Sequence, residues 1–310
     1  MWRFFMKLIN LKDASVFIDV TDRTIRNWID EGRLKKYEDD NGNIMLDKQM
    51  LLRMKPSVIT FFNQKGGCGK TTSSVILTDY FDKKNDKILL VDFDQQGNLS
   101  QTFFMYEELK DSLSLYDYFS NKTPLHKIIK SYNNNIDVLT SNIKLARTDT
   151  IDTSVLVKMK QDFITLFKKY NIVIIDCPPS LNSFSRFGVL LANYIFCPVI
   201  PEPYSYDGLD EVLTSITDLI EFNKDFIDYK AFISSHKQIK TLIRENYITL
   251  LRDELGGKLF NATVPEFVGI VERSMSKTNI FEMYENDKQI NRVYELSQEM
   301  DNFIFDERTI

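Results

Sequence analysis

Three short segments of the sequence carry residues whose types and spacing suit phosphate chemistry. The first reads KGGCGKTT over residues 65–72 and is separated by two residues from the preceding apolar run 58–62. Its glycines let successive backbone N–H groups turn toward one anion, and a helix that begins after them adds its dipole. Lys70 then supplies a positive charge for the β and γ phosphates of a nucleotide, and the Thr71 hydroxyl is placed for Mg²⁺. The strict pattern GxxxxGK[ST] lacks its first glycine here. The residues expected to hold a nucleotide are Gly66, Gly67, Cys68, Gly69, Lys70, Thr71 and Thr72.

The other two segments end an apolar run on an acidic residue. Asp92 and Asp94 lie in the stretch ILLVDFDQQGN over residues 88–98, and both can approach a metal ion or water where the strand stops. Asp176 ends the run IVIID over residues 172–176. A carboxylate after four apolar residues is costly to bury alone, which favours a cationic partner. A plain turn at residues 94–97 and a helix-capping role for Asp176 are the alternatives.

These residues need a scaffold, and the hydrophobic pattern predicts one. From residue 57 onward, continuous runs rich in Ile and Val alternate with amphipathic stretches, which is typical of parallel strands joined by helices. Ligands of such sheets bind beyond the carboxyl ends of the strands, where the three segments lie. We expect strands at 58–62, 88–91, 136–139, 172–175, 194–199 and 230–234, and helices near 70–83, 154–169, 183–192, 206–223 and 240–255.

Composition narrows the class of protein. The chain has 310 residues, a formal net charge of −5 and a pI near 5.3, so its bulk charge does not suit a nucleic-acid coat, although a local basic patch is compatible with it. Nothing approaches the run of about 18 apolar residues that spans a membrane. Three cysteines without a CxxC pair and two histidines exclude a disulfide framework and a zinc site of the usual spacing. We expect a cytoplasmic protein.

Together, the three segments resemble the ParA/MinD superfamily of P-loop ATPases. Residues 65–72 match its deviant Walker A pattern KGGxGK[ST][ST] at every fixed position. Residues 91–98 resemble its VDxDPQGN motif with Gln95 in place of proline, and residues 173–180 resemble its Walker B motif. The resemblance implies ATP and Mg²⁺ as ligands and ATP hydrolysis as the activity. It assigns Lys70 to the ATP of its own subunit and Lys65 to the ATP of a partner, so that ATP closes a homodimer. A solvated loop charge is the alternative for Lys65.

The resemblance assigns the remaining roles as well. Asp94 positions the attacking water, while Thr71, Asp92 and Asp176 serve the metal. The adenine segment corresponds to residues 264–267, with contacts from Pro265 and Phe267, although Glu266 replaces a basic residue of the family pattern. Basic residues at 237, 240 and 244 are either a DNA contact or a solvated helix face.

The resemblance covers about residues 57–275 and favours the plasmid and chromosome partition branch over MinD. The lead-in NQK at residues 63–65 and the run DQQGN at 94–98 support that choice. MinD-like proteins end in a basic amphipathic membrane helix, whereas residues 281–310 are acidic here. Partition by such a protein implies nonspecific DNA binding, nucleoid association, a centromere-binding partner and no membrane.

Residues 1–55 differ from the rest in charge, with a net charge of +2 against −7 for residues 56–310. Ile25, Trp28 and Ile29 share one helical face, Thr21 or Asp22 can cap that helix, and Gly32 can end it. An Asn-Gly turn near residue 42 predicts a following hairpin. Helix, helix and hairpin resemble the MerR/excisionase winged helix-turn-helix module, and a small helical packing module is the alternative. The expected DNA contacts are Arg23, Thr24, Arg26, Asn27, Arg33, Lys35 and Lys36.

The sequence therefore predicts an α/β fold with a mostly parallel sheet and helices on both faces (a P-loop NTPase), preceded by a small winged helix-turn-helix domain. The expected boundary separates residues 1–55 from 56–310. The expected function is that of a DNA-partition ATPase, which also binds an operator if the N-terminal module reads DNA. The alternatives are a nucleotide-switched transcriptional regulator with little turnover and a MinD-like ATPase on a membrane.

Overall fold

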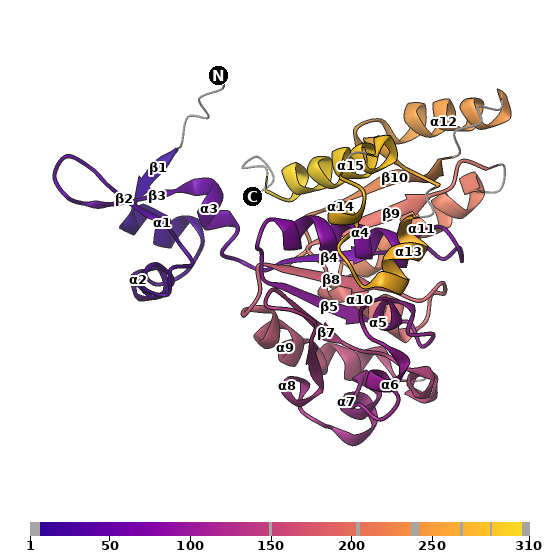
Figure 1. Cartoon of the computed structure of the whole chain (residues 1–310), viewed down its shortest axis with the longest axis horizontal. Coiled ribbons are helices and arrows are strands. Elements are labelled where there is room, and N and C mark those ends of the chain that lie inside the picture. The colour runs from indigo at the N-terminus through magenta and orange to yellow at the C-terminus, as the bar shows by residue number, and fades with distance from the viewer. Residues whose placement is uncertain are drawn as a thin grey trace.

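A computed structural model describes residues 7–148, 151–202, 205–236, 242–266, 269–285 and 287–305. Within these ranges the strands form two sheets (Figure 1), a small antiparallel one in the order β1-β3-β2 and a large one in the order β11-β10-β9-β4-β8-β5-β7-β6. The strands are β1 Leu8–Asn10, β2 Lys36–Glu38, β3 Ile44–Asp47, β4 Ser57–Phe61, β5 Ile88–Asp92, β6 Ile129–Ser131, β7 Ile136–Leu139, β8 Ile172–Asp176, β9 Tyr194–Val199, β10 Asp228–His236 and β11 Leu259–Pro265.

The helices lie between these strands and on both faces of the large sheet (Figure 1). They are α1 Leu11–Phe17, α2 Asp22–Asp30, α3 Lys48–Leu52, α4 Lys70–Lys83, α5 Asn98–Phe103, α6 Tyr106–Leu109, α7 Leu115–Asn121, α8 Leu125–Ile128, α9 Thr153–Phe167, α10 Ser183–Leu191, α11 Ser205–Ile220, α12 Leu242–Leu255, α13 Gly269–Ser276, α14 Ile280–Met283 and α15 Lys288–Ile304.

The large sheet confirms the predicted architecture. Its neighbouring strands are parallel except for β6, which pairs antiparallel with β7 at one edge. Each run expected as a strand forms one, and the ends differ by a residue or two at most. The central strands are buried throughout, as continuous Ile and Val runs require when helices cover both faces.

Alternate residues of each strand serve two different cores. In β4, Ile59 and Phe61 pack with α4 and α15, whereas Val58 packs with α9 and α10 on the opposite face. A third cluster under α11 and α12 covers β9 and β10. The close approach of α10 to the sheet depends on Gly188, because a Cβ there would meet Cys177 Sγ at 2.6 Å.

The C-terminal part contains elements that the sequence analysis did not anticipate. β11 extends the sheet beyond β10, and α15 lies across it. Although residues 281–310 are acidic overall, α15 buries an apolar stripe in the main core. Its buried apolar residues are Ile290, Val293, Leu296, Met300 and Ile304. In the part of the chain that the structure describes, no helix is long and apolar enough to cross a membrane.

The N-terminal elements occur in the expected order of two helices and a hairpin. The side-chain oxygen of Thr21 accepts the backbone N–H of Thr24 at 3.2 Å and caps α2, as predicted. Ile25 is buried in a separate small core, against which Trp28 and Ile29 pack. Gly32 follows α2 with a φ of +71°, which is the left-handed conformation that glycine adopts readily.

The end of α3 ties these elements to the large sheet. Leu52 belongs to the main core, and the Arg53 guanidinium contacts Asp301 at 2.6 Å and Asp86 at 3.3 Å. The Arg53 guanidinium also lies 4.1 Å from the centroid of the Phe305 ring, which adds a cation–π interaction. The N-terminal elements are thus joined to α15 through side chains as well as through the peptide chain.

A buried ion pair holds α13 against the helix that follows β4. The Arg273 side chain is 1 % exposed and contacts Asp79 of α4 through two nitrogens, at 2.9 and 3.1 Å. Its third nitrogen donates to the carbonyl of Thr102 in α5 at 3.0 Å. Asp79 also accepts the backbone N–H of Ile280 at 2.8 Å. One guanidinium therefore links three helices.

Replacing Arg273 by methionine is expected to lower the free energy of unfolding by about 3–5 kcal/mol, because the change leaves the Asp79 carboxylate buried without its partner. Urea denaturation measures this loss. Arg292→Met on the exposed face of α15 is the matched control, with an expected change within about 0.5 kcal/mol. Equal unfolding midpoints for the two variants would show that the pair contributes nothing.

Candidate nucleotide-binding site

The glycine-rich loop lies between β4 and α4, at the carboxyl edge of the sheet. Gly67 and Gly69 have φ values of +72° and +96°, a left-handed conformation that other residues adopt only with strain. Gly69 is the N-cap of α4, and no side chain occupies the cap position. The first N–H groups of a helix of 14 residues therefore lie at the end of the loop, which is a suitable arrangement for binding an anion.

Hydrogen bonds to β9 and β10 hold the loop in place. Asn63 donates to the carbonyl of Pro198 at 2.8 Å and accepts the backbone N–H of Lys65 at 2.8 Å. The Ser234 hydroxyl, near the end of β10, donates to the carbonyl of Cys68 at 2.6 Å. These contacts fix the backbone of the loop, and no motif in the sequence pointed to Ser234.

Lys70 lies over the loop. Its side chain is buried, with 7 % of the residue exposed, and its ammonium donates to the carbonyl of Lys65 at 3.1 Å. The Cys68 sulfur lies 3.8 Å from the same nitrogen. The ammonium is thus placed at the loop whose N–H groups would cradle phosphates, where the sequence analysis expected it.

Asp176 lies at the end of β8 and faces the first turn of α4. Its carboxylate accepts the Thr71 hydroxyl at 2.6 Å and the Ser74 hydroxyl at 3.5 Å. Burial raises the pKa of Asp176 to about 7, and the Thr71 hydrogen bond and the Lys70 charge oppose that shift. A cationic partner was expected for the Asp176 carboxylate. In the structure its hydrogen-bond donors are the Thr71 and Ser74 hydroxyls, and the Lys70 charge acts on it as well. Ser74 was missed, although its spacing of three from Thr71 places the two on one helical face.

This pair of oxygen ligands fits Mg²⁺. Magnesium is held in proteins by one or two oxygen ligands together with phosphate oxygens and water, and it needs no all-protein cage. Thr71 and Asp176 supply a hydroxyl and a carboxylate at the helix end. Among the residues that the structure describes, no group of three or more His, Cys, Asp or Glu side chains could hold a metal alone.

Asp92 lies beside Asp176 in the sheet, because the two residues are paired in register across β5 and β8. Its carboxylate is fully buried and accepts the backbone N–H and the hydroxyl of Ser100 at 2.8 and 2.6 Å. Burial, followed by the charge of Asp176, raises its pKa to about 8. Asp92 thus fixes the start of α5, and a supporting place in the metal shell stays a prediction.

Asp94 lies two residues further on and forms a turn. Its carboxylate accepts the N–H of Gln96 at 2.9 Å and its carbonyl accepts the N–H of Gly97 at 2.9 Å. The residue is 6 % exposed. The neighbouring Gln95, which replaces the proline of the resembled motif, buries its Oε1 without a hydrogen-bond partner among the described residues. The turn that was the alternative for residues 94–97 therefore forms, with the Asp94 carboxylate at the carboxyl edge of β5, and a role of Asp94 toward water stays a prediction.

Lys65 differs from Lys70 in its surroundings. Its side chain is 40 % exposed and its ammonium lies 3.2 Å from Glu202, in the loop after β9. The two lysines of the loop therefore have different directions, with Lys70 turned inward and Lys65 at the surface beside Glu202. Glu202 was not singled out from the sequence.

Cys68 occupies the variable position of the loop motif and is buried. Burial raises the pKa of its thiol, as is typical of an unreactive cysteine. Its backbone carbonyl is engaged by Ser234, so the residue contributes to the loop through its main chain. Thr72 follows in the first turn of α4 and is half-buried.

The remaining expected contacts lie in other parts of the chain. Pro265 is buried at the end of β11, where it pairs with His236, while Phe267 lies outside the described residues. Residues 237 and 240 also lie outside them.

The expected DNA contacts lie in and after α2. Arg23, Arg26 and Asn27 of α2 are exposed, and Thr24 is half-buried. Arg33 lies over the ring of Trp28, and Lys36 contacts Glu38 at 2.9 Å. Lys35 is exposed beside Tyr37.

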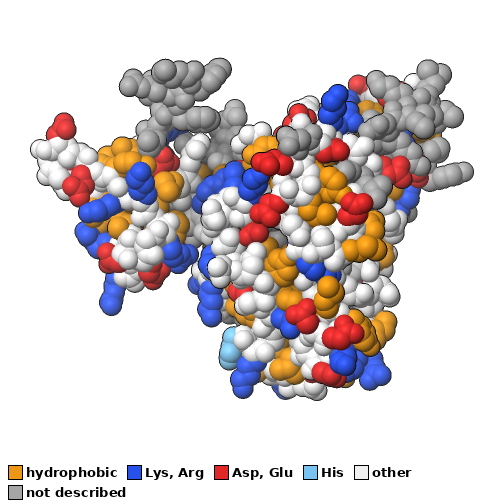
Figure 2. Space-filling model, viewed as in Figure 1, with side chains coloured by type: hydrophobic (Ala, Val, Ile, Leu, Met, Phe, Trp, Pro, Cys, Tyr) orange, Lys and Arg blue, Asp and Glu red, His pale blue; other side chains and the backbone are white. Residues whose placement is uncertain are grey.

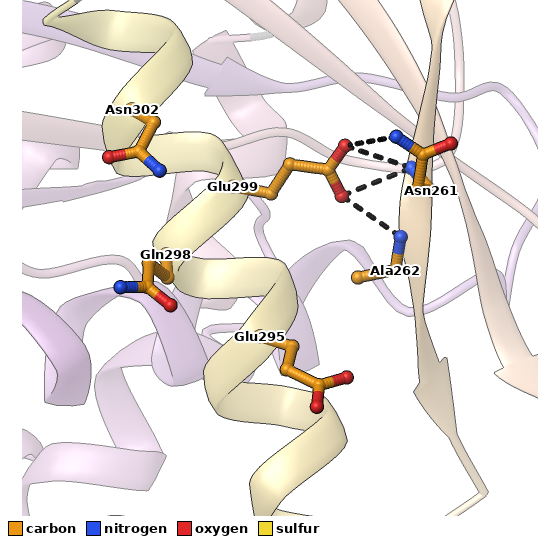
Figure 3. Close-up of a pocket in the computed structure, with 6 residues that line it drawn as sticks. All are labelled: Asn261, Ala262, Glu295, Gln298, Glu299 and Asn302. Carbon is orange, nitrogen blue, oxygen red and sulfur yellow. Dashed lines mark hydrogen bonds between the residues drawn. The ribbon is translucent and has the colours of Figure 1, made fainter.

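A polar cavity of about 390 Å³ lies elsewhere, between β11 and α15 (Figure 3). There the Glu299 carboxylate accepts the backbone N–H groups of Asn261 at 3.0 Å and Ala262 at 2.9 Å. β11 is an edge strand of the large sheet, so these groups would otherwise be open to a strand of another molecule. We therefore assign Glu299 to protection of the sheet edge.

Comparison with known proteins places the site in a family. A model of the family described as AAA domain matches residues 56–228. The chain belongs to this AAA domain family. The chain is similar to the chromosome-partitioning ATPase Soj of Treponema pallidum, with 28 % identity over 218 residues that cover 69 % of this chain and 85 % of that protein. A virulence plasmid ParA family protein of Chlamydia psittaci is 24 % identical over 257 residues, which cover 81 % and 97 % of the two chains.

Solved structures share the fold. A putative plasmid partition protein of Borrelia burgdorferi bound to AMPPNP superposes with a TM-score of 0.63 and 22 % identity, covering 79 % of this chain and 98 % of that one. Cobyrinic acid a,c-diamide synthase of Mycobacterium smegmatis, with a bound ATP analogue and magnesium, gives a TM-score of 0.67 and 19 % identity over 82 % and 98 % of the chains. Both neighbours hold an ATP analogue, and the synthase holds magnesium together with the analogue or with ADP, in agreement with the expected ligands.

Proposed function

We propose that this chain is a ParA-type partition ATPase that binds and hydrolyses ATP, dimerises with ATP and Mg²⁺, and binds DNA. The observation that carries the proposal is the convergence of Lys70, Thr71 and Asp176 on a glycine-rich loop at the start of α4. Two comparisons support the proposal. The chain belongs to the AAA domain family, and the similar proteins named above include a chromosome-partitioning ATPase.

The residues of the site have distinct roles in this proposal. Thr71 and Asp176 hold Mg²⁺, which when bound neutralises phosphate charge and acts as a Lewis acid. Lys70 and the loop N–H groups bind the β and γ phosphates, and Asp94 orients the attacking water. Phosphoryl transfer depends mainly on such positioning and charge stabilisation, so no covalent intermediate on the protein is needed. Pro265 and Phe267 flank the adenine.

Lys65 acts in the partner subunit. Its ammonium lies at the surface beside the site, and its contact with Glu202 is an exposed ion pair, which contributes little to stability. The ammonium can therefore leave Glu202 for the phosphates of a facing subunit. Two such lysines close a homodimer around two nucleotides.

In the cell, the dimer binds nucleoid DNA in the cytoplasm, and a centromere-binding protein stimulates hydrolysis. The N-terminal elements form a winged helix-turn-helix domain over residues 1–55, ahead of the ATPase domain at 56–310. Its helix α2 reads bases, since Arg23, Arg26 and Asn27 are exposed there. Arg33, Lys35 and Lys36 contact phosphates.

Replacing Arg26 and Asn27 together by alanine is expected to weaken binding of a DNA sequence selected by the protein at least about 10-fold, because each base contact contributes about 1–3 kcal/mol. ATP hydrolysis should stay unchanged. Point substitutions suit this test better than deletion of residues 1–55, since Leu52 and Arg53 contribute to the main core. Fluorescence anisotropy with a duplex selected from random sequences measures the affinity.

Lys110→Ala, an exposed lysine far from α2 in the sequence, is the control for the loss of charge. Sequence-specific binding that survives the double substitution would remove α2 from the proposal.

The alternative function, a nucleotide-switched regulator, predicts that ATP raises DNA affinity while hydrolysis stays unmeasurable with DNA present. Co-sedimentation with anionic vesicles in ATP would instead favour a MinD-like protein.

A further inference from the structure

Six exposed lysines lie at the edge of the large sheet opposite the nucleotide site. They come from three separate segments of the chain and are Lys55, Lys83, Lys84, Lys87, Lys168 and Lys169. We call this set the basic edge. Lys55 precedes β4, and Lys83 is the last residue of α4. Lys84 and Lys87 lie between α4 and β5, and Lys168 and Lys169 lie between α9 and β8.

The topology brings these segments together. β8 lies between β4 and β5, and Ile172 of β8 is paired in register with Ser57 of β4 and with Ile88 of β5. The starts of three adjacent strands are therefore level, and the lysines that precede them share one edge. Helices α4 and α9 end at the same edge, where their dipoles favour cations.

Most of this positive charge has no acidic partner among the residues that the structure describes. The same three segments contain two aspartates, Asp82 and Asp86, and Asp86 is buried against Arg53. Asp82 accepts hydrogen bonds from Asn133 and Asn135. Lys84 is paired with Asp301. In the described part of the chain, no acidic side chain forms an ion pair with the others, which are Lys55, Lys83, Lys87, Lys168 and Lys169.

The basic edge lies beside the N-terminal elements. Asn171, directly before β8, donates to the carbonyl of Arg53 at 2.7 Å, and Arg53 contacts Asp86 directly before Lys87. Figure 2 shows Lys and Arg side chains gathered on the side of the large domain that faces the N-terminal elements, and further ones on those elements. The whole chain has a net charge of −5, so this concentration of positive charge is a local feature of its surface.

We propose that the basic edge binds the phosphate backbone of duplex DNA on the flank of the site that α2 occupies. This inference rests on the proposed function, because it needs DNA held by the N-terminal elements. Duplex DNA carries about one negative charge per 1.7 Å of helix axis. A duplex that continues beyond the N-terminal elements therefore presents phosphates along its length, which the lysines of the basic edge can contact. Such contacts add affinity without sequence preference.

The test compares the triple variant Lys83→Gln, Lys168→Gln and Lys169→Gln with a control of equal charge. The control is Lys110→Gln, Lys127→Gln and Lys144→Gln, three exposed lysines after α6, in α8 and after β7. Both full-length proteins are titrated with ADP present against duplexes of about one and a half and about four turns, at several salt concentrations. Hydrolysis of ATP should equal that of the wild type in both variants.

On the long duplex, the triple variant should lose roughly 10- to 100-fold in affinity at low salt, and the slope of log K against log salt should fall by about 2–3, since each phosphate contact contributes about 0.9. The control variant and the short duplex should show little change. Equal slopes for the triple variant and wild type, or an equal loss on both duplexes, would overturn the inference while leaving the proposed function standing.

Two further outcomes separate the explanations. If the triple variant keeps its DNA affinity but no longer co-sediments with vesicles of phosphatidylserine and phosphatidylcholine, the edge binds an anionic membrane and the inference is wrong. If the wild-type protein binds neither duplex with any nucleotide, the proposed function and the inference both fail.

Discussion

Replacing Lys70 with alanine is expected to lower the rate of ATP hydrolysis at least about 100-fold and to weaken nucleotide binding, because the loop loses the cation placed for the β and γ phosphates. The structure supports a large effect, since the Lys70 side chain is buried and its ammonium donates to the loop carbonyl of Lys65. Phosphate release and binding of a fluorescent ATP analogue measure the two quantities.

The matched control for this change is Lys83→Ala, at the other end of the same helix. Its lysine is exposed and distant from the loop along α4, so hydrolysis should be unaffected. If Lys70→Ala hydrolysed ATP at the wild-type rate, the loop would not be the catalytic phosphate site.

Asp94→Asn is expected to reduce hydrolysis by about 10²–10⁴-fold while ATP binding stays near that of the wild type. The asparagine oxygen can still accept the N–H of Gln96, so the turn is retained and only the negative charge that orients water is removed. A protein that still dimerises with ATP but turns over slowly is the expected product.

Single-turnover hydrolysis and nucleotide affinity are measured side by side for Asp94→Asn. A loss of affinity equal to the loss of rate would indicate that the substitution damages the fold of the site. An unchanged rate would remove Asp94 from the mechanism and leave the other carboxylates, Asp92 and Asp176, as candidates.

Local sequence signals predicted the parts of the site that depend on local structure. The spacing of Gly67, Gly69 and Lys70 reports a backbone conformation and a helix start that lie within a few residues of one another. The apolar run before Asp176 likewise reports one buried strand and its end. Both features were expected, and the structure places both at the carboxyl edge of the sheet.

Contacts between distant segments could not be predicted in this way. Arg273 and Asp79 are 194 positions apart, and nothing in the short helix Gly269–Ser276 indicates that its arginine is buried. The burial of Cys68 also depends on a distant segment, because the Ser234 hydroxyl of β10 contacts the Cys68 carbonyl. The buried apolar stripe of α15 was not predicted, because residues 281–310 were judged by their acidic composition and not by the helical spacing of their apolar residues.

The central claim, that ATP joins two subunits through Lys65, is tested most directly by the mass of the Mg²⁺–ATP form in solution. Light scattering on the 36.3 kDa chain is performed with ADP and with a nonhydrolysable ATP analogue, for the wild type, Lys65→Ala and the control Glu202→Gln. The account predicts a monomer in ADP for all three proteins and, with the analogue, twice that mass for the wild type and Glu202→Gln but not for Lys65→Ala. A wild type that stays monomeric with the analogue at every concentration, or a Lys65→Ala protein that dimerises as well as the wild type, would contradict it.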